Sequence, residues 1–297
     1  MAANLKEVRE RIRSVQNTQQ ITKAMKMVSA AKLRRAQDAI QKMRPYAEKL
    51  NNMLSNILSN LEGDAETVFG QERELKQACL VVVTSDRGLC GAFNTNVCKA
   101  AVQTIETKFA DAYANGNLTI MCIGKRGFDY FRKRYSDAAI DNSHVNLFHD
   151  LSFENISKVA KSLLVAFEKQ EFDAIDVAYG KFKNAATQYT ITEQFLPVAR
   201  IEKEEGDNLL ADYIFEPSKV QLLEYLVPTI LQTQFQKFLL DTNASEHGAR
   251  MTAMDKATEN ANELLRDLRI SYNKARQEAI TNEILEIVGG AAALESN

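Results

Sequence analysis

The sequence predicts an α/β fold in which a single α/β domain is inserted between two long terminal helices that pair as an antiparallel coiled coil. Three observations support this prediction. Residues 4–43 contain neither Pro nor Gly, and their apolar residues recur three and four positions apart. The chain after Pro217 has the same period. Between these ends, short apolar runs alternate with helical patterns, as α/β layers require. We therefore divide the chain into an N-terminal helix (1–62), an α/β domain (75–200) and a C-terminal helix (217–297).

The N-terminal helix carries a heptad-like apolar seam. The seam begins with Leu5, Val8, Ile12 and Val15. It resumes after the polar stretch "QNTQQ" with Ile21, Met25, Val28, Ala31 or Leu33, Ala36, Ile40 and Met43. The interruption predicts a polar layer and a shift of register. We expect the helix to continue past Pro45 with a bend, and to end at "LEGD" (61–64), with Gly63 as its C-cap.

The C-terminal helix carries a second seam. It comprises Met251, Met254, Ala257 or Thr258, Ala261, Leu264 or Leu265, Leu268, Tyr272, Ala275 and Ala279. Pro228 should kink this helix or mark a short break. A helix over 218–288 would be about 105 Å long at 1.5 Å per residue. A domain of this size cannot bury such a helix along its whole length, so it must lie against another long helix or protrude.

The middle of the chain predicts a Rossmann-like α/β domain. Residues 78–86 and 117–124 resemble short buried strands, and 96–114, 125–135 and 152–170 resemble helices, the last capped by Ser152. Residues 172–182 and 186–198 alternate with period two, which predicts an antiparallel end of the sheet.

Charge is distributed unevenly along the chain. Residues 1–49 hold twelve Lys and Arg against four Asp and Glu, a net charge of +8, whereas the other residues carry −10. A basic arm on an acidic body indicates an acidic partner for the arm. The arm's cations include Lys23, Lys26, Lys32, Arg34 and Arg35, spread over more than one face. Nucleic acid is the rival partner, but no aromatic platform lies beside them and the pI is near 6.1.

Cysteines and apolar runs limit the class of protein. The four cysteines (Cys79, Cys90, Cys98 and Cys122) lack metal-site spacing, and three of them lie in or beside apolar runs, which predicts buried, reduced thiols. No apolar run approaches the ~20 residues of a membrane span. The first residues lack the composition of a signal or transit peptide, so we expect the protein to stay in the compartment where it is made.

The stretch "SDRGLCGAFN" (85–94) follows a predicted strand and precedes a predicted helix, as phosphate-binding loops do. Its glycines, Gly88 and Gly91, are spaced G-x-x-G, and no Lys-Ser/Thr follows, so the P-loop pattern is not met. A structural turn is the alternative, in which Gly88 and Gly91 permit a tight turn and Asp86 pairs with Arg87. His144, His149 and His247 are scattered, so we predict no catalytic, cofactor-binding or metal site.

The apolar C-terminal end, from Ile284 to Leu294, favours a hydrophobic sleeve supplied by another protein. Burial within its own domain is the alternative.

Four stretches closely resemble the gamma subunit of F-type ATP synthases. They are "IRSVQNTQQITKAMKMVSAAKLRRAQ" (12–37), "TSDRGLCGAFN" (84–94), "ASEHGARMTAMDKATENA" (244–261) and "YNKARQEAITNEILEIVGGAAAL" (272–294). The resemblance implies a non-catalytic central rotor shaft that couples proton flow to ATP synthesis in the beta subunits. The implied partners are a 3:3 ring of alpha and beta subunits, the epsilon subunit and the membrane c-ring.

The resemblance also implies roles for particular residues. Met25, with Lys23 and Lys26, would approach a beta subunit, and Arg276 and Gln277 would contact the beta catch loops. Ile284, Leu285, Ile287 and Val288 would form the tip held in the ring's hydrophobic bearing. The turn of Asp86, Arg87, Gly88 and Gly91 would be structural.

The sequence departs from the family in one place and lacks one optional feature. Family members often have Gln-Ala where this chain has His247-Gly248, and Gly248 predicts a locally softer helix. The regulatory cysteine pair of chloroplast members is not evident over 195–217. We expect a bacterial protein, peripheral on the cytoplasmic face of the plasma (inner) membrane. Two alternatives remain open, a nucleotide-binding α/β enzyme with helical extensions and a nucleic-acid-binding coiled-coil protein.

Overall fold

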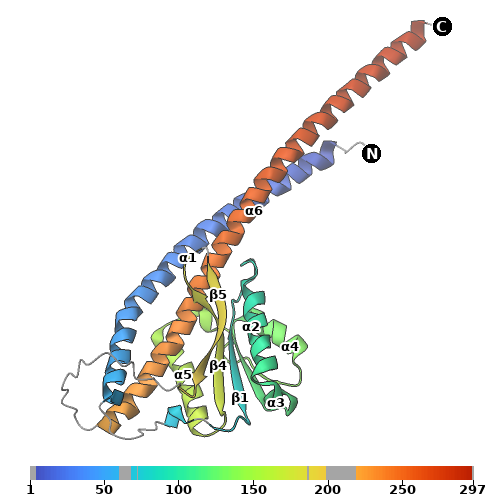
Figure 1. Cartoon of the computed structure of the whole chain (residues 1–297). Helices are drawn as coiled ribbons and strands as arrows, with labels where there is room; N and C mark the ends of the chain where they lie inside the picture. The colour runs from blue at the N-terminus through green and yellow to red at the C-terminus, as the bar shows by residue number, and fades with distance from the viewer. Residues whose placement is uncertain (1–4, 60–67, 72, 186, 199–218, 296–297) are drawn as a thin grey trace. The chain divides into compact units, whose positions relative to one another are not determined.

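The computed structural model describes residues 5–59, 68–71, 73–185, 187–198 and 219–295. The chain forms two compact units, one of residues 1–28 and 251–297 and one of residues 29–250. Two long helices, α1 (Leu5–Ser59) and α6 (Lys219–Glu295), contribute to both units. The predicted fold class, an α/β domain inserted between two long terminal helices, is confirmed (Figure 1).

The first unit is an antiparallel helix pair. Four side-chain hydrogen bonds join α1 to α6, and as the position in α1 rises the position in α6 falls. They link Arg9 with Tyr272, Gln19 with Asn262, Thr22 with Thr258 and Lys26 with Asp255. Of the predicted seam on α6, Met254, Ala261, Leu265 and Leu268 are buried, whereas Leu264 is 40% exposed.

The predicted shift of register in α1 is wrong. Thr22 and Ser29 are buried, whereas Ile21 and Val28 are 60% and 57% exposed. The less exposed positions continue every three or four residues from Val15 through Gln19 to Thr22 without interruption. Polar side chains occupy the seam because they bond to polar partners on α6, which satisfies groups whose burial would otherwise be unfavourable.

The second unit contains a five-stranded sheet with the order β3-β2-β1-β4-β5. The strands are β1 (Ala78–Val83), β2 (Leu118–Ile123), β3 (Ala139–Asp141), β4 (Ala174–Phe182) and β5 (Gln188–Leu196). β1 pairs in parallel with both β2 and β4. β5 is antiparallel to β4, as the sequence predicts. The three-residue edge strand β3 was not predicted, since so short a segment carries no alternating pattern.

Helices cover both faces of this sheet. The helices are α2 (Phe93–Thr107), α3 (Ala110–Ala114), α4 (Lys125–Arg134) and α5 (Phe153–Glu168), with short 3-10 turns at Val68–Gly70 and Leu147–His149. One core joins α2, α3 and α4 to Leu80, Val82 and their neighbours in the sheet. The other joins α5 and the Val227–Leu239 part of α6 to the opposite face, around Val81, Val83 and Tyr179. β1 is fully buried between them, which explains its continuous apolar sequence.

Several local predictions differ from the structure. Pro228 lies inside a continuous α6, so it marks no break, whereas α1 continues through Pro45, as predicted. The predicted helix over 96–114 is two helices, α2 and α3, interrupted between Thr107 and Ala110. Ser152 occupies the N-cap position of α5, but its side chain makes no capping hydrogen bond. Instead Asp150 accepts hydrogen bonds from the Ser152 backbone and the Asn155 amide.

Gly63, the predicted C-cap, lies outside the described residues. No helix in the described part of the chain is long and apolar enough to cross a membrane.

Candidate functional site

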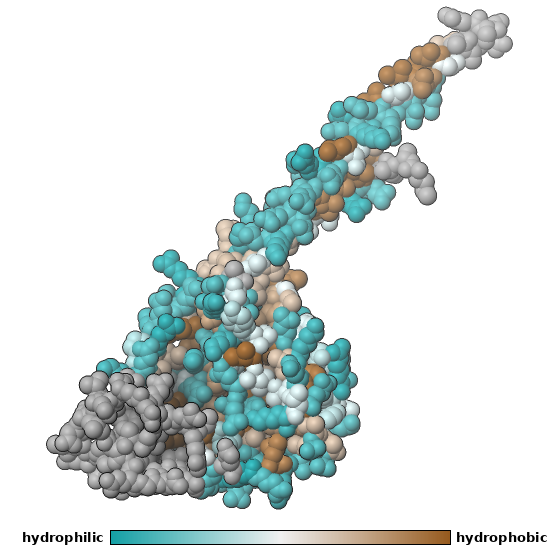
Figure 2. All heavy atoms as spheres, viewed as in Figure 1, coloured by the Kyte–Doolittle hydropathy of each residue, from teal (hydrophilic) through white to brown (hydrophobic). Residues whose placement is uncertain are grey.

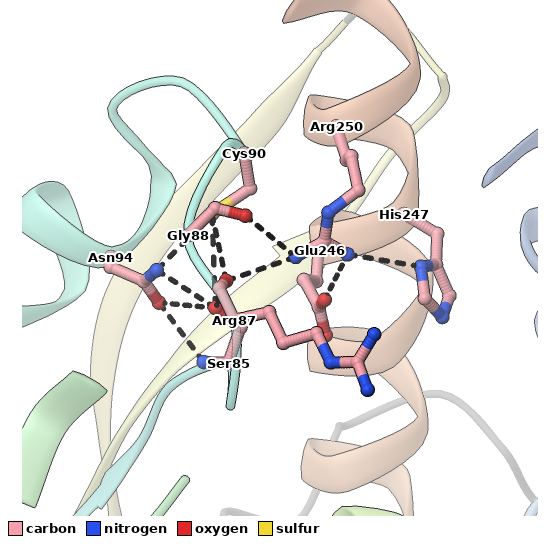
Figure 3. Close-up of polar contacts among 8 residues, drawn as sticks. All are labelled: Ser85, Arg87, Gly88, Cys90, Asn94, Glu246, His247 and Arg250. Atoms are coloured by element: carbon pink, nitrogen blue, oxygen red, sulfur yellow. Dashed lines mark hydrogen bonds and ion pairs between the residues drawn. The ribbon is translucent and has the colours of Figure 1, made fainter. Parts of the chain in front are cut away.

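The turn that follows β1 is held by its own side chains (Figure 3). The Asn94 side chain accepts a hydrogen bond from the Ser85 backbone N–H at 2.9 Å, and its amide nitrogen lies 2.8 Å from Ser85 Oγ. Ser85 Oγ in turn donates to the Arg87 carbonyl at 2.7 Å. Gly91 has a φ of 60° and Leu89 a φ of 64°, so the backbone is left-handed at both. Leu89 adopts this conformation at a cost, because its Cβ crowds the backbone there.

Arg250 of α6 binds the outer part of this turn. Its guanidinium donates to the carbonyls of Arg87 and Gly88, at 3.0 and 3.3 Å, and forms an ion pair with Glu246 one helical turn earlier. The side chains of Arg250 and Glu246 are both only about 10% exposed. A buried guanidinium therefore joins α6 to the turn after β1, as Figure 3 shows.

Burial sets the protonation of this cluster. Desolvation raises the pKa of Glu246, and Arg250 opposes that rise by stabilising the carboxylate. Desolvation lowers the pKa of His247 to about 4, and the charges of Arg250 and Lys32 add to the effect. His247 is therefore neutral at pH 7, and it is buried.

The geometry of the turn is unsuited to phosphate. A phosphate-binding loop directs backbone N–H groups at the anion. Here the carbonyls of Arg87 and Gly88 face Arg250, so the acceptors of the turn are directed at a cation that the chain itself supplies. The phosphate-cradle interpretation therefore loses its basis.

A doubly wound sheet usually binds its ligand at the carboxyl ends of the strands where the strand order reverses, which here is between β1 and β4. Thr242 and Ser245 of α6 hydrogen-bond to the backbone of Gly180 near the end of β4, and Arg250 holds the turn after β1. α6 thus occupies this position. Within the residues that the structure describes, no group of His, Cys, Asp or Glu side chains could hold a metal ion.

Asp86 does not pair with Arg87, which corrects the prediction. Its carboxylate accepts a long hydrogen bond, 3.4 Å, from the Lys125 backbone N–H and lies 3.6 Å from His149 Nε2. Gly88 lies against Arg126, since a Cβ at this position would stand 3.0 Å from the guanidinium. The Arg87 side chain is exposed.

The predicted rotor-contact residues lie in the helix pair. Lys23 is exposed and Met25 is partly buried, and Lys26 is engaged in the ion pair with Asp255. Arg276 and Gln277 are exposed on α6, about one turn beyond Tyr272.

The end of α6 extends past its partner. Arg9 bonds to Tyr272, so the first described residue of α1, Leu5, is level with Arg276. Beyond this level the predicted tip is exposed: Ile284, Leu285, Ile287 and Val288 are between 55% and 66% accessible. Figure 2 shows this apolar stretch near the C-terminal end of the helix.

Sequence reasoning missed the Glu246–Arg250 pair and its contact with the turn. The i, i+4 spacing of opposite charges in "SEHGAR" was an available signal, but such pairs usually lie on a solvated face. Only the packing of α6 against the sheet shows that this pair is buried.

The four cysteines are free and buried, as predicted. Burial raises the thiol pKa of Cys98 to about 11 and that of Cys122 to about 12, which keeps both protonated and unreactive in the folded chain.

Comparison with known proteins gives one consistent result. A family model described as ATP synthase matches residues 4–294. A protein of Cytophaga hutchinsonii called ATP synthase gamma chain is 53% identical over 295 residues, covering 99% of both chains. The gamma chain of Flavobacterium psychrophilum is 55% identical over 293 residues, again with 99% coverage of both.

Among solved structures, a chain of the Euglena gracilis mitochondrial ATP synthase (OSCP/F1/c-ring) matches with a TM-score of 0.69. It is 24% identical, and the match covers 98% of this chain and 95% of that one, which shows a common fold. Full-length identity above 50% to curated gamma chains establishes the family. This chain belongs to the ATP synthase gamma chain family, and is therefore a non-catalytic subunit of the ATP synthase complex rather than an enzyme in itself.

Proposed function

We propose that this chain is the central rotor shaft of a bacterial ATP synthase, and that it transmits rotation driven by proton flow to the catalytic beta subunits. One observation carries the proposal beyond family membership. α6 continues without a partner from α1 past Arg276 and exposes Ile284, Leu285, Ile287 and Val288. Four large apolar side chains on two turns of a lone helix are unfavourable in water and require an apolar sleeve.

The sleeve in this proposal is the ring of three alpha and three beta subunits. Because a turning shaft presents each side chain to different subunits in succession, its contacts must be weak individually. Exposed ion pairs, at roughly 0–1 kcal/mol each, meet this requirement. The net charge of +8 on residues 1–49 supplies the cations.

The proposed contact residues differ in whether their side chains already have a partner within this chain. Lys23, Arg276 and Gln277 are exposed and take part in none of the hydrogen bonds or ion pairs between described residues. Lys26 already neutralises Asp255 across the helix pair, so it contributes little net charge to a partner. We therefore assign the main polar contacts with beta to Lys23, Arg276 and Gln277, and a packing contact to Met25.

The α/β domain is, in this proposal, the part that meets the epsilon subunit and the membrane c-ring. The complex would then hold the chain peripherally at the cytoplasmic face of the plasma (inner) membrane.

Co-purification tests the assembly directly. The chain, expressed with the alpha and beta subunits of its own complex, should be recovered as one copy per three alpha and three beta. Recovery of the alpha and beta subunits without it, under conditions that retain their ring, would contradict the proposal.

Arg276→Ala tests the residue assignment. Losing one exposed contact of up to about 1 kcal/mol lowers the coupled rate by up to about fivefold. The measurement is ATP synthesis by energised membrane vesicles that contain the variant complex. Arg269→Ala is the matched control, since Arg269 is also an exposed arginine of α6 but lies two turns before Arg276, where α6 is still paired with α1. Equal rates for the two variants would remove Arg276 from this role.

A further inference from the structure

Helix α4 (Lys125–Arg134) carries a cationic outer face that the rotor proposal does not use. Five of its ten residues are basic, one is acidic, and all six of these charged side chains are exposed: Lys125, Arg126, Asp129, Arg132, Lys133 and Arg134. The opposite side of the helix is anchored by Phe131, which is fully buried in the core. α4 lies beside α2 on one face of the sheet, as Figure 1 shows.

The helix dipole explains only part of this charge. Cations in the last turn, Arg132 to Arg134, are favoured by the partial negative charge at the helix C-terminus. Lys125 and Arg126 occupy the first turn, where the dipole disfavours cations, and this turn contains no acidic residue of its own. Stability of the helix alone therefore does not account for the charges at its N-terminal end.

These cations are not neutralised within the described part of the chain. Among its ion pairs, none includes any of the five basic residues of α4. By contrast, Lys26, Lys108, Lys158 and Lys181 each have a carboxylate partner.

Two of the guanidinium groups are held in place by aromatic rings. The Arg132 guanidinium lies 5.3 Å from the Phe128 ring centre, and the Arg134 guanidinium lies 4.3 Å from that of Tyr130. A ring that covers one face of a guanidinium leaves its edge N–H groups free to bind carboxylates. Holding the side chains in advance also reduces the entropy lost on binding.

We propose that the outer face of α4 binds an acidic segment of a protein partner within the complex. The fit is one of charge: carboxylates of the partner opposite Lys125 and Arg126 at one end, and opposite Arg132 and Lys133 two turns away. Asp129 separates the two groups and selects the class of partner. An anionic membrane would set phosphates against Asp129 as well, whereas a protein can place a cation there. This inference rests on the proposed function only in that the partner belongs to the ATP synthase complex.

Zero-length cross-linking tests the inference. A carbodiimide joins a lysine amine to a carboxylate in contact with it, and the purified complex would be treated and analysed by mass spectrometry. Lys125 or Lys133 should be joined to Asp or Glu of another chain. The Lys181–Glu193 pair, 3.2 Å apart with both side chains accessible, is the internal positive control. Lys161, an exposed lysine of α5, gives the background yield.

A variant makes the test specific. R132Q/R134Q should lower the interchain yield at Lys133 at least fivefold, while K158Q/K161Q should not change it. An interchain yield at Lys125 and Lys133 no higher than at Lys161 would overturn the inference. So would sedimentation of the isolated chain with phosphatidylglycerol vesicles that R132Q/R134Q abolishes, because the surface would then bind lipid. Co-purification with alpha and beta is scored separately, so failure here is distinguishable from failure of the rotor proposal.

Discussion

Replacing Arg250 by Ala should destabilise the α/β domain strongly, because it removes the cation paired with the buried Glu246 carboxylate. Arg250 and Glu246 are both about 10% exposed on the side chain. Breaking a buried ion pair from one side costs about 3–5 kcal/mol, mainly because the remaining charge stays buried without compensation. The Arg87 and Gly88 carbonyls lose donors too, but they lie near the surface, where water substitutes. We therefore expect the free energy of unfolding to fall by about 3–5 kcal/mol.

The double variant E246Q/R250M separates the buried charge from the rest of the site. It removes both charges and keeps approximate volume, and such replacements are often close to neutral. We expect it to recover most of the stability that Arg250→Ala loses.

The pH dependence of unfolding provides a second test of the buried charge. Without Arg250, only the smaller effect of Lys32 opposes the desolvation that raises the pKa of Glu246, so the folded variant takes up a proton there more readily than the unfolded chain. The difference in unfolding free energy between the parent and Arg250→Ala should therefore shrink as the pH falls from 7 towards 5.

Urea unfolding, monitored by thiol labelling, measures the free energy of unfolding of the α/β domain. Cys79, Cys98 and Cys122 are buried in the α/β domain, so their labelling reports its opening and not the fraying of the helix pair. A loss below about 1 kcal/mol for Arg250→Ala, at the level of an exposed pair, would refute the argument that burial makes this ion pair important.

Three further predictions concern the same domain. Burial raises the pKa of Asp241 to about 6, so at this residue the folded chain binds more protons than the unfolded chain between about pH 4 and 6. Burial lowers the pKa of His247 to about 4, so at this residue the folded chain binds fewer protons than the unfolded chain between about pH 4 and 6.5. Asp241→Asn should therefore lose stability on acidification relative to the parent and His247→Gln should gain it, as urea titrations at pH 7 and pH 5 would show; parallel curves would contradict this. Gly248→Leu should lower the free energy of unfolding by about 1–3 kcal/mol, because a Cβ there already stands 3.1 Å from Gln188 Nε2 and 3.3 Å from the Ala185 carbonyl. Gly248→Ala should change it by less than about 1 kcal/mol, because the higher helix propensity of Ala offsets the close contact. Chemical unfolding of the two variants distinguishes these outcomes. The buried thiols should remain unlabelled by a water-soluble disulfide reagent at pH 8 until urea opens the domain, and rapid labelling of Cys122 in the native chain would contradict its burial.

The amino-acid sequence was sufficient to predict the two long terminal helices and four of the five strands of the sheet. Long stretches without Pro or Gly, with apolar residues three and four apart, left few alternatives to paired helices. The continuous apolar run of β1 identified a strand buried on both faces, and the alternation over 186–198 identified the antiparallel edge. These signals are local, so they can be recognised along the chain.

Which side of each helix packs against its neighbours becomes clear only from the tertiary structure. Ile21 and Val28 were placed in the seam because they are apolar, but the seam accepts Thr22 because Thr258 bonds to it from the other helix. Gly248 suggested a soft point in a helix, whereas the structure shows that a Cβ there would crowd the backbone of Ala185.

The turn after β1 shows the same division most clearly. The sequence showed a strand, two glycines and the start of a helix, a pattern that suits both a phosphate cradle and a structural corner. Arg250, more than 160 positions away in the chain, decides between them, because its guanidinium binds the Arg87 and Gly88 carbonyls. Residues so distant meet only when α6 packs on the sheet, and no local pattern encodes that contact.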